Sequence, residues 1–201
     1  MKFKNLDKKR IFIVGLGISG LSLAIKLKKE NIDYYCWDDR ERIRISCLKK
    51  KLNLISPDKV DFHKIDLLVL SPGISNDHKT VSLAKKYQCE IISDIELIKF
   101  ISNELFLIGI TGTNGKSTTT KLVEYALKEN KKNSFSAGNI GIPISKLKLK
   151  QHILTYLIVE ASSFQLERII ELKFNISVLL NISNDHIDRH KNIGNYIAAK
   201  S

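Results

Sequence analysis

The 201 residues are 43% hydrophobic and carry a net charge of +12, so the chain has enough apolar content for a buried core in one large domain or two small ones. The excess lysines occur as scattered pairs without interleaved aromatic residues, so we interpret them as solvated faces and expect no nucleic-acid partner. The three cysteines form no Cys-x-x-Cys pattern, and no apolar run approaches the roughly 20 residues of a membrane helix, so we expect a cytoplasmic protein without membrane contact.

A strand, a glycine-rich turn and a helix open the chain. Residues 10–14 predict a strand, the turn Gly15-Leu16-Gly17-Ile18-Ser19-Gly20 follows, and residues 21–30 have helical periodicity. This is the Gly-x-Gly-x-x-Gly turn that approaches a phosphate in dinucleotide-binding folds. A second strand at 33–37 ends in Asp38 and Asp39, about where a ribose-binding acid is expected. Two interpretations remain open here: a dinucleotide such as NAD, or the nucleotide end of another substrate.

The remaining elements of the first half are shorter. A predicted strand at 65–70 ends in Ser71-Pro72-Gly73-Ile74-Ser75, at a carboxyl end where α/β ligand sites form, although a plain Pro-Gly turn explains this stretch alone better. A polar helix is predicted at 77–87, a strand at 90–92, and a helix from 93 or 94 to 101, capped by Ser93 or Asp94. We place a domain boundary near residue 93, which divides the chain into residues 1–93 and 94–201.

The second half opens on a predicted phosphate cradle. A buried strand at 105–110 leads into Thr111-Gly112-Thr113-Asn114-Gly115-Lys116-Ser117-Thr118, and a helix follows with Leu122, Ala126 and Leu127 on one face. In such a loop the backbone N–H groups surround an anion, the lysine reaches the outer phosphates, and the next hydroxyl ligates magnesium. The strict pattern has glycine where this chain has Ile110, so the loop is a variant. We predict binding of a nucleoside triphosphate, because an ordinary glycine turn does not need the Gly-Lys-Ser order.

Two polar residues follow later predicted strands. A buried strand at 153–159 ends at Glu160, where an acid beside a phosphate loop suits a magnesium ligand and equally suits a charge at a helix N-terminus. A short strand at 134–137 precedes Gly138-Asn139-Ile140-Gly141. Another at 175–181 precedes Asn184-Asp185-His186, and the last helix spans about 193–201. His186 is either a metal ligand or a loop histidine, and its spacing alone favours the second.

Six sequence blocks, in order, resemble the Mur ligase family and within it the D-glutamate-adding members. They lie at residues 15–20, 71–75, 111–117, 138–141, 160–167 and 184–190. Folylpolyglutamate synthases share the phosphate loop but lack the leading glycine-rich domain. The L-alanine-adding ligases usually have histidine where this chain has Asn114.

The resemblance implies a fold and an activity. The fold is α/β, with a Rossmann-like parallel-sheet domain for a UDP substrate at 1–93 and the first part of a P-loop-type ATPase domain at 94–201. The activity is that of a monomeric ligase, dependent on ATP and Mg2+, that phosphorylates the carboxylate of UDP-N-acetylmuramoyl-L-alanine for attack by the amine of D-glutamate in peptidoglycan precursor synthesis. A full member continues through a larger central domain into a third domain, so we expect these 201 residues not to complete catalysis alone.

The resemblance also assigns residue roles. It places the ATP phosphates against Gly112, Thr113, Asn114, Gly115, Lys116, Ser117 and Thr118. Lys116 would neutralise the transferred phosphoryl group, Ser117 and Glu160 would hold one magnesium, and His186 with a carbamylated Lys200 would hold a second. The resemblance assigns binding of the uridine nucleotide to Ile18, Ser19, Asp38, Asp39 and Arg40, with Ser71, Pro72 and Gly73 lining the same crevice. It assigns binding of the muramoyl end of the substrate to Asn139, Ser162, Gln165 and His186. Asp39 departs from the family pattern, which has a hydroxyl there.

Three alternatives to this interpretation remain. The chain could be a non-catalytic remnant that only binds a uridine nucleotide through residues 1–93, or another member of the same ligase family. An NAD-dependent oxidoreductase is supported only by the turn at 15–20 and by Asp38, and it leaves the phosphate loop unexplained.

Overall fold

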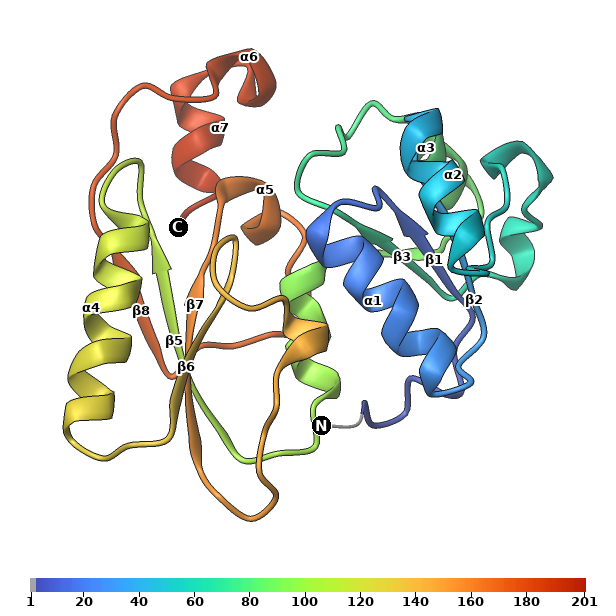
Figure 1. Cartoon of the computed structure of the whole chain (residues 1–201). Helices are drawn as coiled ribbons and strands as arrows, with labels where there is room; N and C mark the ends of the chain where they lie inside the picture. The colour runs from blue at the N-terminus through green and yellow to red at the C-terminus, as the bar shows by residue number, and fades with distance from the viewer. Residues whose placement is uncertain (1–2) are drawn as a thin grey trace.

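Two parallel four-stranded sheets stand side by side in the computed structural model, which describes residues 3–201 (Figure 1). The first sheet has the order β2-β1-β3-β4 and comprises β1 (Ile11–Val14), β2 (Tyr34–Trp37), β3 (Leu67–Leu70) and β4 (Glu90–Ser93). The second has the order β6-β7-β5-β8 and comprises β5 (Leu105–Thr111), β6 (Ser134–Gly138), β7 (Thr155–Glu160) and β8 (Ile176–Leu179). The predicted α/β class is confirmed.

Helices cover both faces of the first sheet because its two inner strands, β1 and β3, are apolar on both sides. Ile11 and Ile13 of β1 belong to the core beneath α1 (Ile18–Lys29) and α2 (Glu41–Lys49), whereas Phe12 and Val14 belong to the core beneath α3 (Lys79–Lys86). Helix α2 was not predicted from the sequence. Cys47 is the one fully buried residue of that helix, so its apolar periodicity is weak.

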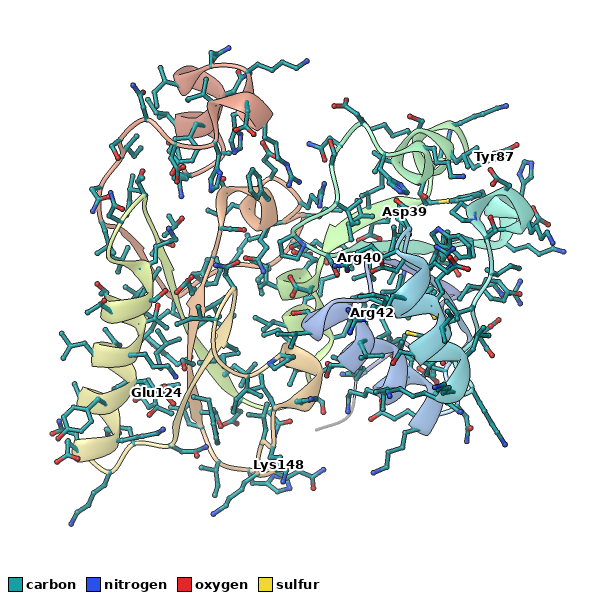
Figure 2. All side chains as sticks on the ribbon, turned by 45° about the horizontal axis from the view of Figure 1, so that its top comes forward. Asp39, Arg40, Arg42, Tyr87, Glu124 and Lys148 are labelled. Carbon is teal, nitrogen blue, oxygen red and sulfur yellow. The ribbon has the colours of Figure 1, made fainter. Side chains whose placement is uncertain are left out.

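The helix after the phosphate loop, α4 (Lys116–Glu129), packs only part of the predicted face against the second sheet. Leu127 packs against the core there as expected, together with Val123. Leu122 is 63% exposed and Ala126 is exposed, whereas Thr120 and Glu124 are buried. Burial alone would raise the pKa of Glu124, but hydrogen bonds from Lys128, Ser136 and Lys121 outweigh it and lower that pKa to about 2. These polar contacts connect Glu124 of α4, labelled in Figure 2, to Ser136 of β6, in addition to the apolar contacts of Val123 and Leu127.

The helix predicted from 93 or 94 to 101 forms between the sheets as a 3-10 helix at Asp94–Phe100, and Ser93, its N-cap residue, makes no side-chain cap bond. It lies between the two sheets in Figure 1 and is buried except at Lys99. Its apolar residues join one continuous core that includes residues of both sheets. This segment is therefore held mainly by its tertiary contacts with both sheets. The boundary at residue 93 stays a prediction.

The other helical segments are short. They are α5 (Ser163–Leu166), α6 (Ile187–His190), α7 (Ile193–Ala198) and 3-10 turns at Pro57–Lys59, Phe62–Lys64 and Ile144–Lys146. β8 forms an edge of the second sheet, where Ile176 and Leu179 are exposed. Within residues 3–201 no helix combines the length and the apolarity that crossing a membrane requires.

Candidate functional site

The phosphate loop connects the end of β5 to the start of α4. Gly115 caps α4 with φ +82°, a left-handed conformation that favours glycine. The backbone N–H groups of Thr113 and Asn114 donate to the backbone and side-chain oxygens of Asn181 at 3.0 and 2.9 Å. Lys116 folds over the loop, and its Nζ donates to the carbonyl oxygens of Gly112 and Thr113 at 2.9 and 2.8 Å. A lysine in this position can transfer its hydrogen bonds to an incoming phosphate.

Ser117 and Glu160 meet next to this loop because β5 and β7 are neighbouring parallel strands. The Ser117 hydroxyl donates to one carboxylate oxygen of Glu160 at 2.8 Å, and the Asn139 amide donates to the other oxygen at 2.8 Å. Glu160 is almost fully buried. A hydroxyl and a carboxylate at this distance are hard oxygen ligands of the kind that Mg2+ prefers, so these residues fit the predicted ion.

Lys200 contacts the phosphate loop, and His186, the residue before α6, lines the same cavity as Lys200. Nζ of Lys200 donates to Oγ1 of Thr111 at 3.0 Å and to the Gly112 carbonyl oxygen at 2.9 Å. Burial, followed by the positive charge of Lys116, lowers the pKa of Lys200 to about 8. A larger fraction of this amine is therefore neutral near pH 7 than in an exposed lysine, and the neutral amine is the nucleophilic form.

A cavity of about 310 Å³ joins these residues, and we call it the phosphate-loop cavity. It is lined by Pro72, Gly73, Lys116, Asn139, Ser162, Ser163, Phe164, Asp185, His186, Arg189, Tyr196 and Lys200. Three permanent or readily protonated cations, Lys116, Arg189 and Lys200, face a single lining acid, Asp185. This balance favours an anionic occupant.

A second cavity of about 490 Å³, the glycine-turn cavity, lies at the carboxyl ends of the first sheet. It is lined by Gly15, Gly17, Ile18, Ser19, Asp38, Asp39, Arg40, Ser71, Pro72, Gly73 and Ile74. Pro72 and Gly73 therefore line both cavities.

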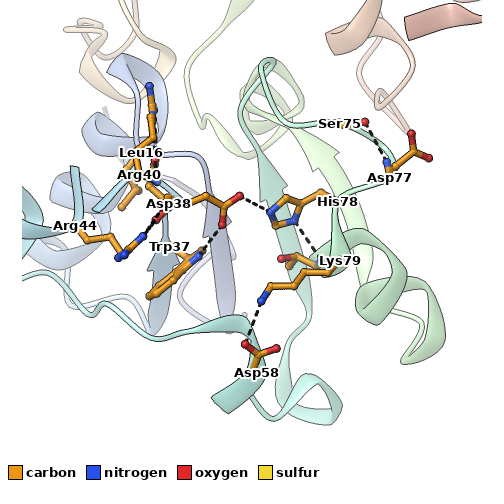
Figure 3. Close-up of polar contacts among 12 residues, drawn as sticks. Leu16, Trp37, Asp38, Arg40, Arg44, Asp58, Ser75, Asp77, His78 and Lys79 are labelled. Atoms are coloured by element: carbon orange, nitrogen blue, oxygen red, sulfur yellow. Dashed lines mark hydrogen bonds and ion pairs between the residues drawn. The ribbon is translucent and has the colours of Figure 1, made fainter. Parts of the chain in front are cut away.

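Asp38 fixes the floor of the glycine-turn cavity. Its carboxylate accepts from the backbone N–H of Leu16 at 2.7 Å and from the guanidinium of Arg40 at 2.9 Å (Figure 3). Burial would raise the pKa of Asp38, but the bonds from Arg40 and Leu16 lower it on balance. This carboxylate therefore stays charged and ties the glycine turn to the end of β2.

Asp39, the residue that departs from the family pattern, has partners of its own. Its carboxylate accepts from Nε1 of Trp37 at 3.0 Å and lies 2.9 Å from Nε2 of His78 (Figure 3). Arg44 lies over the Trp37 ring at 4.6 Å and donates to the backbone oxygens of residues 38 and 39. The exposed Asp39 carboxylate lines the glycine-turn cavity and can only accept hydrogen bonds. The hydroxyl that the family pattern has at this position could also donate one.

Close packing explains the third glycine of the turn. A Cβ at Gly20 would lie 2.0 Å from the Gly15 carbonyl oxygen, whereas a Cβ at Gly17 would meet nothing within 4 Å. We expect Gly20→Ala to lower the free energy of unfolding by about 1–3 kcal/mol, because α1 has to move away from β1. Gly17→Ala, the matched control, is expected to leave it within about 0.5 kcal/mol. Urea unfolding of both variants checks this, and equal midpoints would contradict it.

The remaining predicted substrate residues are placed differently from one another. Ser162 and Asn139 line the phosphate-loop cavity, and Ser19 and the 80% exposed Ile18 line the glycine-turn cavity. Gln165 is fully buried: it forms a capping box with Ser162, and its amide donates to Asp94 at 2.8 Å. Gln165 therefore supports the site from behind.

Asp94 is hydrogen-bonded to both Gln165 and Ser19. Burial raises its pKa, and hydrogen bonds from Gln165 and Ser19 oppose that rise. One buried carboxyl group thus holds the glycine turn of the first sheet and the cap of α5.

Several site residues were not predicted. Arg189 falls inside the sixth sequence block and lines the phosphate-loop cavity, although no role was predicted for it. Ser163 and His190 lie 2.9 Å apart, between Oγ and Nε2, and Nδ1 of His190 lies 3.0 Å from Oε1 of Glu167. Nothing in the residue spacing signals these contacts, because they form only when α5 and α6 fold against each other.

Two family models match the chain. The Mur ligase MurD-like N-terminal domain matches residues 9–93, and the Mur ligase middle domain matches residues 110–201. The UDP-N-acetylmuramoylalanine--D-glutamate ligase of Wolbachia pipientis wMel is 43% identical over 203 residues, which cover 99% of this chain and 39% of that protein. The enzyme of the same name from Rickettsia bellii (strain RML369-C) is 39% identical over 196 residues, 96% of this chain and 43% of that protein.

The fold has relatives among solved structures. The UDP-N-acetylmuramate:L-alanyl-gamma-D-glutamyl-meso-diaminopimelate ligase from Neisseria meningitides aligns with a TM-score of 0.60 at 17% identity, over 95% of this chain and 66% of that one. At this identity the likeness concerns the fold alone. The chain spans less than half the length of the two curated relatives.

Proposed function

The chain belongs to the Mur ligase family, and from this premise we propose that it is the N-terminal part of a ligase that joins D-glutamate to UDP-N-acetylmuramoyl-L-alanine at the expense of ATP. One observation carries the proposal: the glycine-turn cavity and the phosphate-loop cavity share Pro72 and Gly73 as a wall. A substrate with a nucleotide at one end and a reacting carboxylate at the other needs two such adjoining sites.

The phosphate loop and the adjoining phosphate-loop cavity suit the activation of a carboxylate. A carboxylate is a poor electrophile, and ATP with Mg2+ supplies the phosphoryl group that turns its oxygen into a leaving group. Lys116 would bind the transferred phosphoryl group, with Gly112, Thr113, Asn114, Gly115 and Thr118 around the phosphate chain. Ser117 and Glu160 would hold Mg2+, and the neutral fraction of Lys200 is the form that carbamylation requires before it can join His186 as a metal ligand.

The glycine-turn cavity suits the uridine nucleotide. Ile18 and Ser19 on the turn, with Asp38, Asp39 and Arg40 after β2, would hold it. We place Asn139 and Ser162 against the muramoyl end, with Gln165 behind them. We also propose a division into domains at residue 93, a monomer, and a cytoplasmic location.

The test is a calorimetric titration of this chain with UDP-N-acetylmuramoyl-L-alanine, with NAD as the matched competitor ligand. We expect saturable binding of the first and none of the second. Binding of NAD alone would contradict the proposal and favour an oxidoreductase.

Phosphate release from ATP, assayed with UDP-N-acetylmuramoyl-L-alanine and magnesium, with and without D-glutamate, then separates a ligase from a remnant. Release that requires both substrates would show a complete catalytic unit. Substrate binding without phosphate release would mean that this chain binds the nucleotide substrate but does not catalyse the reaction.

A further inference from the structure

Two arginines from the second half of the chain hold a turn of the first half. Arg189, in α6, donates from Nη1 to the Pro72 carbonyl oxygen at 2.9 Å and from Nη2 to the Ile74 carbonyl oxygen at 2.8 Å. Arg168 donates from Nη2 to the same Ile74 oxygen at 2.8 Å and to Oδ1 of Asn76 at 2.6 Å. The turn that these four bonds hold contains Pro72 and Gly73, the wall shared by the two cavities.

The two buried arginines are expected to lower the stability of the fold. Arg168 is only 6% exposed, and both guanidinium groups lie close enough to repel each other. Burial, then the charge of Arg189, lowers the pKa of Arg168 to about 10, and burial lowers the pKa of Arg189 as well. Nε of both residues and Nη1 of Arg168 are buried without a hydrogen-bond partner among residues 3–201. Buried cations that are incompletely paired usually cost more than apolar residues of similar size.

Two neighbours partly offset this cost. The Arg189 guanidinium lies 3.7 Å from the centre of the Phe164 ring, and the charge of Glu167 acts on both arginines. Phe164 also lines the phosphate-loop cavity, so the ring that supports Arg189 is part of the site. The two arginines thus hold the turn in place beside the site.

We propose that Arg168 and Arg189 are positioning residues that fix the Pro72–Gly73 turn as a common wall, so that one ligand spanning both cavities binds as a single unit. This inference rests on the proposed function, and it names the spanning ligand as the nucleotide-linked substrate. UDP, which fills the glycine-turn cavity alone, should depend on the pair much less.

The first domain holds the near side of the turn by itself, which is why UDP should be less sensitive. The Ser71 N–H donates to the Val14 carbonyl oxygen at 3.0 Å, and its hydroxyl donates to the Gly15 carbonyl oxygen at 2.7 Å. These bonds remain when the arginines are replaced. The far side, at Pro72 and Ile74, has the arginine donors instead.

The experiment compares calorimetric affinities for UDP and for UDP-N-acetylmuramoyl-L-alanine in wild type, Arg189→Gln and Arg168→Gln. Each substitution is expected to weaken binding of the spanning ligand about tenfold and that of UDP less than about twofold, since ionic hydrogen bonds to the turn are lost. Arg168 is not among the described residues that line either cavity, so its effect separates positioning from direct ligand contact. Arg42→Gln, an exposed arginine of α2, is the matched control and should change neither affinity (Figure 2).

Conservative replacement adds a second criterion. Arg189→Lys should fail to restore the spanning ligand's affinity, because one ammonium group cannot reproduce the planar fork that reaches both carbonyl oxygens. Equal losses for both ligands, or no loss for either, would overturn the proposal.

A readout without ligand keeps the inference testable if the proposed function fails. Hydrogen exchange at the backbone amide of Ile74, which donates to the Ser71 carbonyl oxygen at 3.0 Å, should be at least about tenfold faster in Arg189→Gln than in wild type, while the amides of β1 and β3 stay protected. Wild type that binds no uridine nucleotide would refute the proposed function. Unchanged exchange in the variant would refute the arginine pair as the device that holds the turn.

Discussion

Lys116→Ala is expected to abolish measurable binding of MgATP to this chain. Nζ of Lys116 reaches the carbonyl oxygens of Gly112 and Thr113 from within the loop, so an incoming phosphate can replace those acceptors without moving the backbone. Losing two ionic hydrogen bonds costs roughly 3–6 kcal/mol, which corresponds to an affinity at least about 100-fold weaker. Isothermal titration calorimetry with MgATP measures the affinities of wild type and Lys116→Ala.

Lys121→Ala provides the matched control for this prediction. Lys121 lies in the same helix, but its Nζ bonds to Glu124 and Ser136 on the sheet-facing side of α4 and not to the loop. Its removal should leave MgATP affinity within about twofold, since a half-exposed ion pair contributes little and lies away from the phosphates. Similar affinities in wild type and Lys116→Ala would mean that the loop does not bind phosphate through this lysine.

The strand, turn and helix of the phosphate loop could be predicted because one continuous stretch of sequence specifies all three, while phosphate binding there stays a prediction. A strand, glycines that permit a left-handed turn, and a lysine at the helix start are all local features. Glu160 was predictable to a lesser degree, since the sequence shows that it ends a strand. The order β6-β7-β5-β8, which places that end beside Ser117, is a tertiary fact.

Features that depend on contacts between distant segments could not be predicted. The burial of Glu124 in α4 is stabilised by Ser136 of β6, and the pattern of apolar residues in the helix pointed to Leu122 instead. The same is true of Arg189, whose acceptors lie 115 and 117 residues away in sequence. Sequence patterns report which residues face a core, but not which buried polar groups find partners there.

Glu96→Ala is expected to produce the largest loss of stability among the substitutions considered. Glu96, in the 3-10 segment between the sheets, is 0% exposed. Its carboxylate accepts from the backbone N–H groups of Ile170, Glu171 and Leu172 at 3.2, 2.9 and 3.3 Å. Lys99 completes the set, with Nζ at 3.2 Å.

The expected cost follows from what remains after truncation. Alanine would leave the partly buried Lys99 without one of its partners and three backbone N–H groups without an acceptor. Breaking a buried pair of this kind costs about 3–5 kcal/mol, a large part of the 5–15 kcal/mol typical of a whole domain. Urea unfolding measures it, and Asp58→Ala, which removes an exposed pair with Lys79, should leave the midpoint unchanged.

Glu96→Gln keeps the prediction testable if the alanine variant fails to fold. Glutamine retains one carbonyl oxygen as an acceptor but directs an amide N–H₂ toward groups that are themselves donors, so its destabilisation should fall between wild type and Glu96→Ala. The loss should also appear as faster hydrogen exchange at residues 170–172, because their amides lose their acceptor. A glutamine variant as stable as wild type would mean that shape, and not the charge of Glu96, joins the segment between the sheets to the turn after α5.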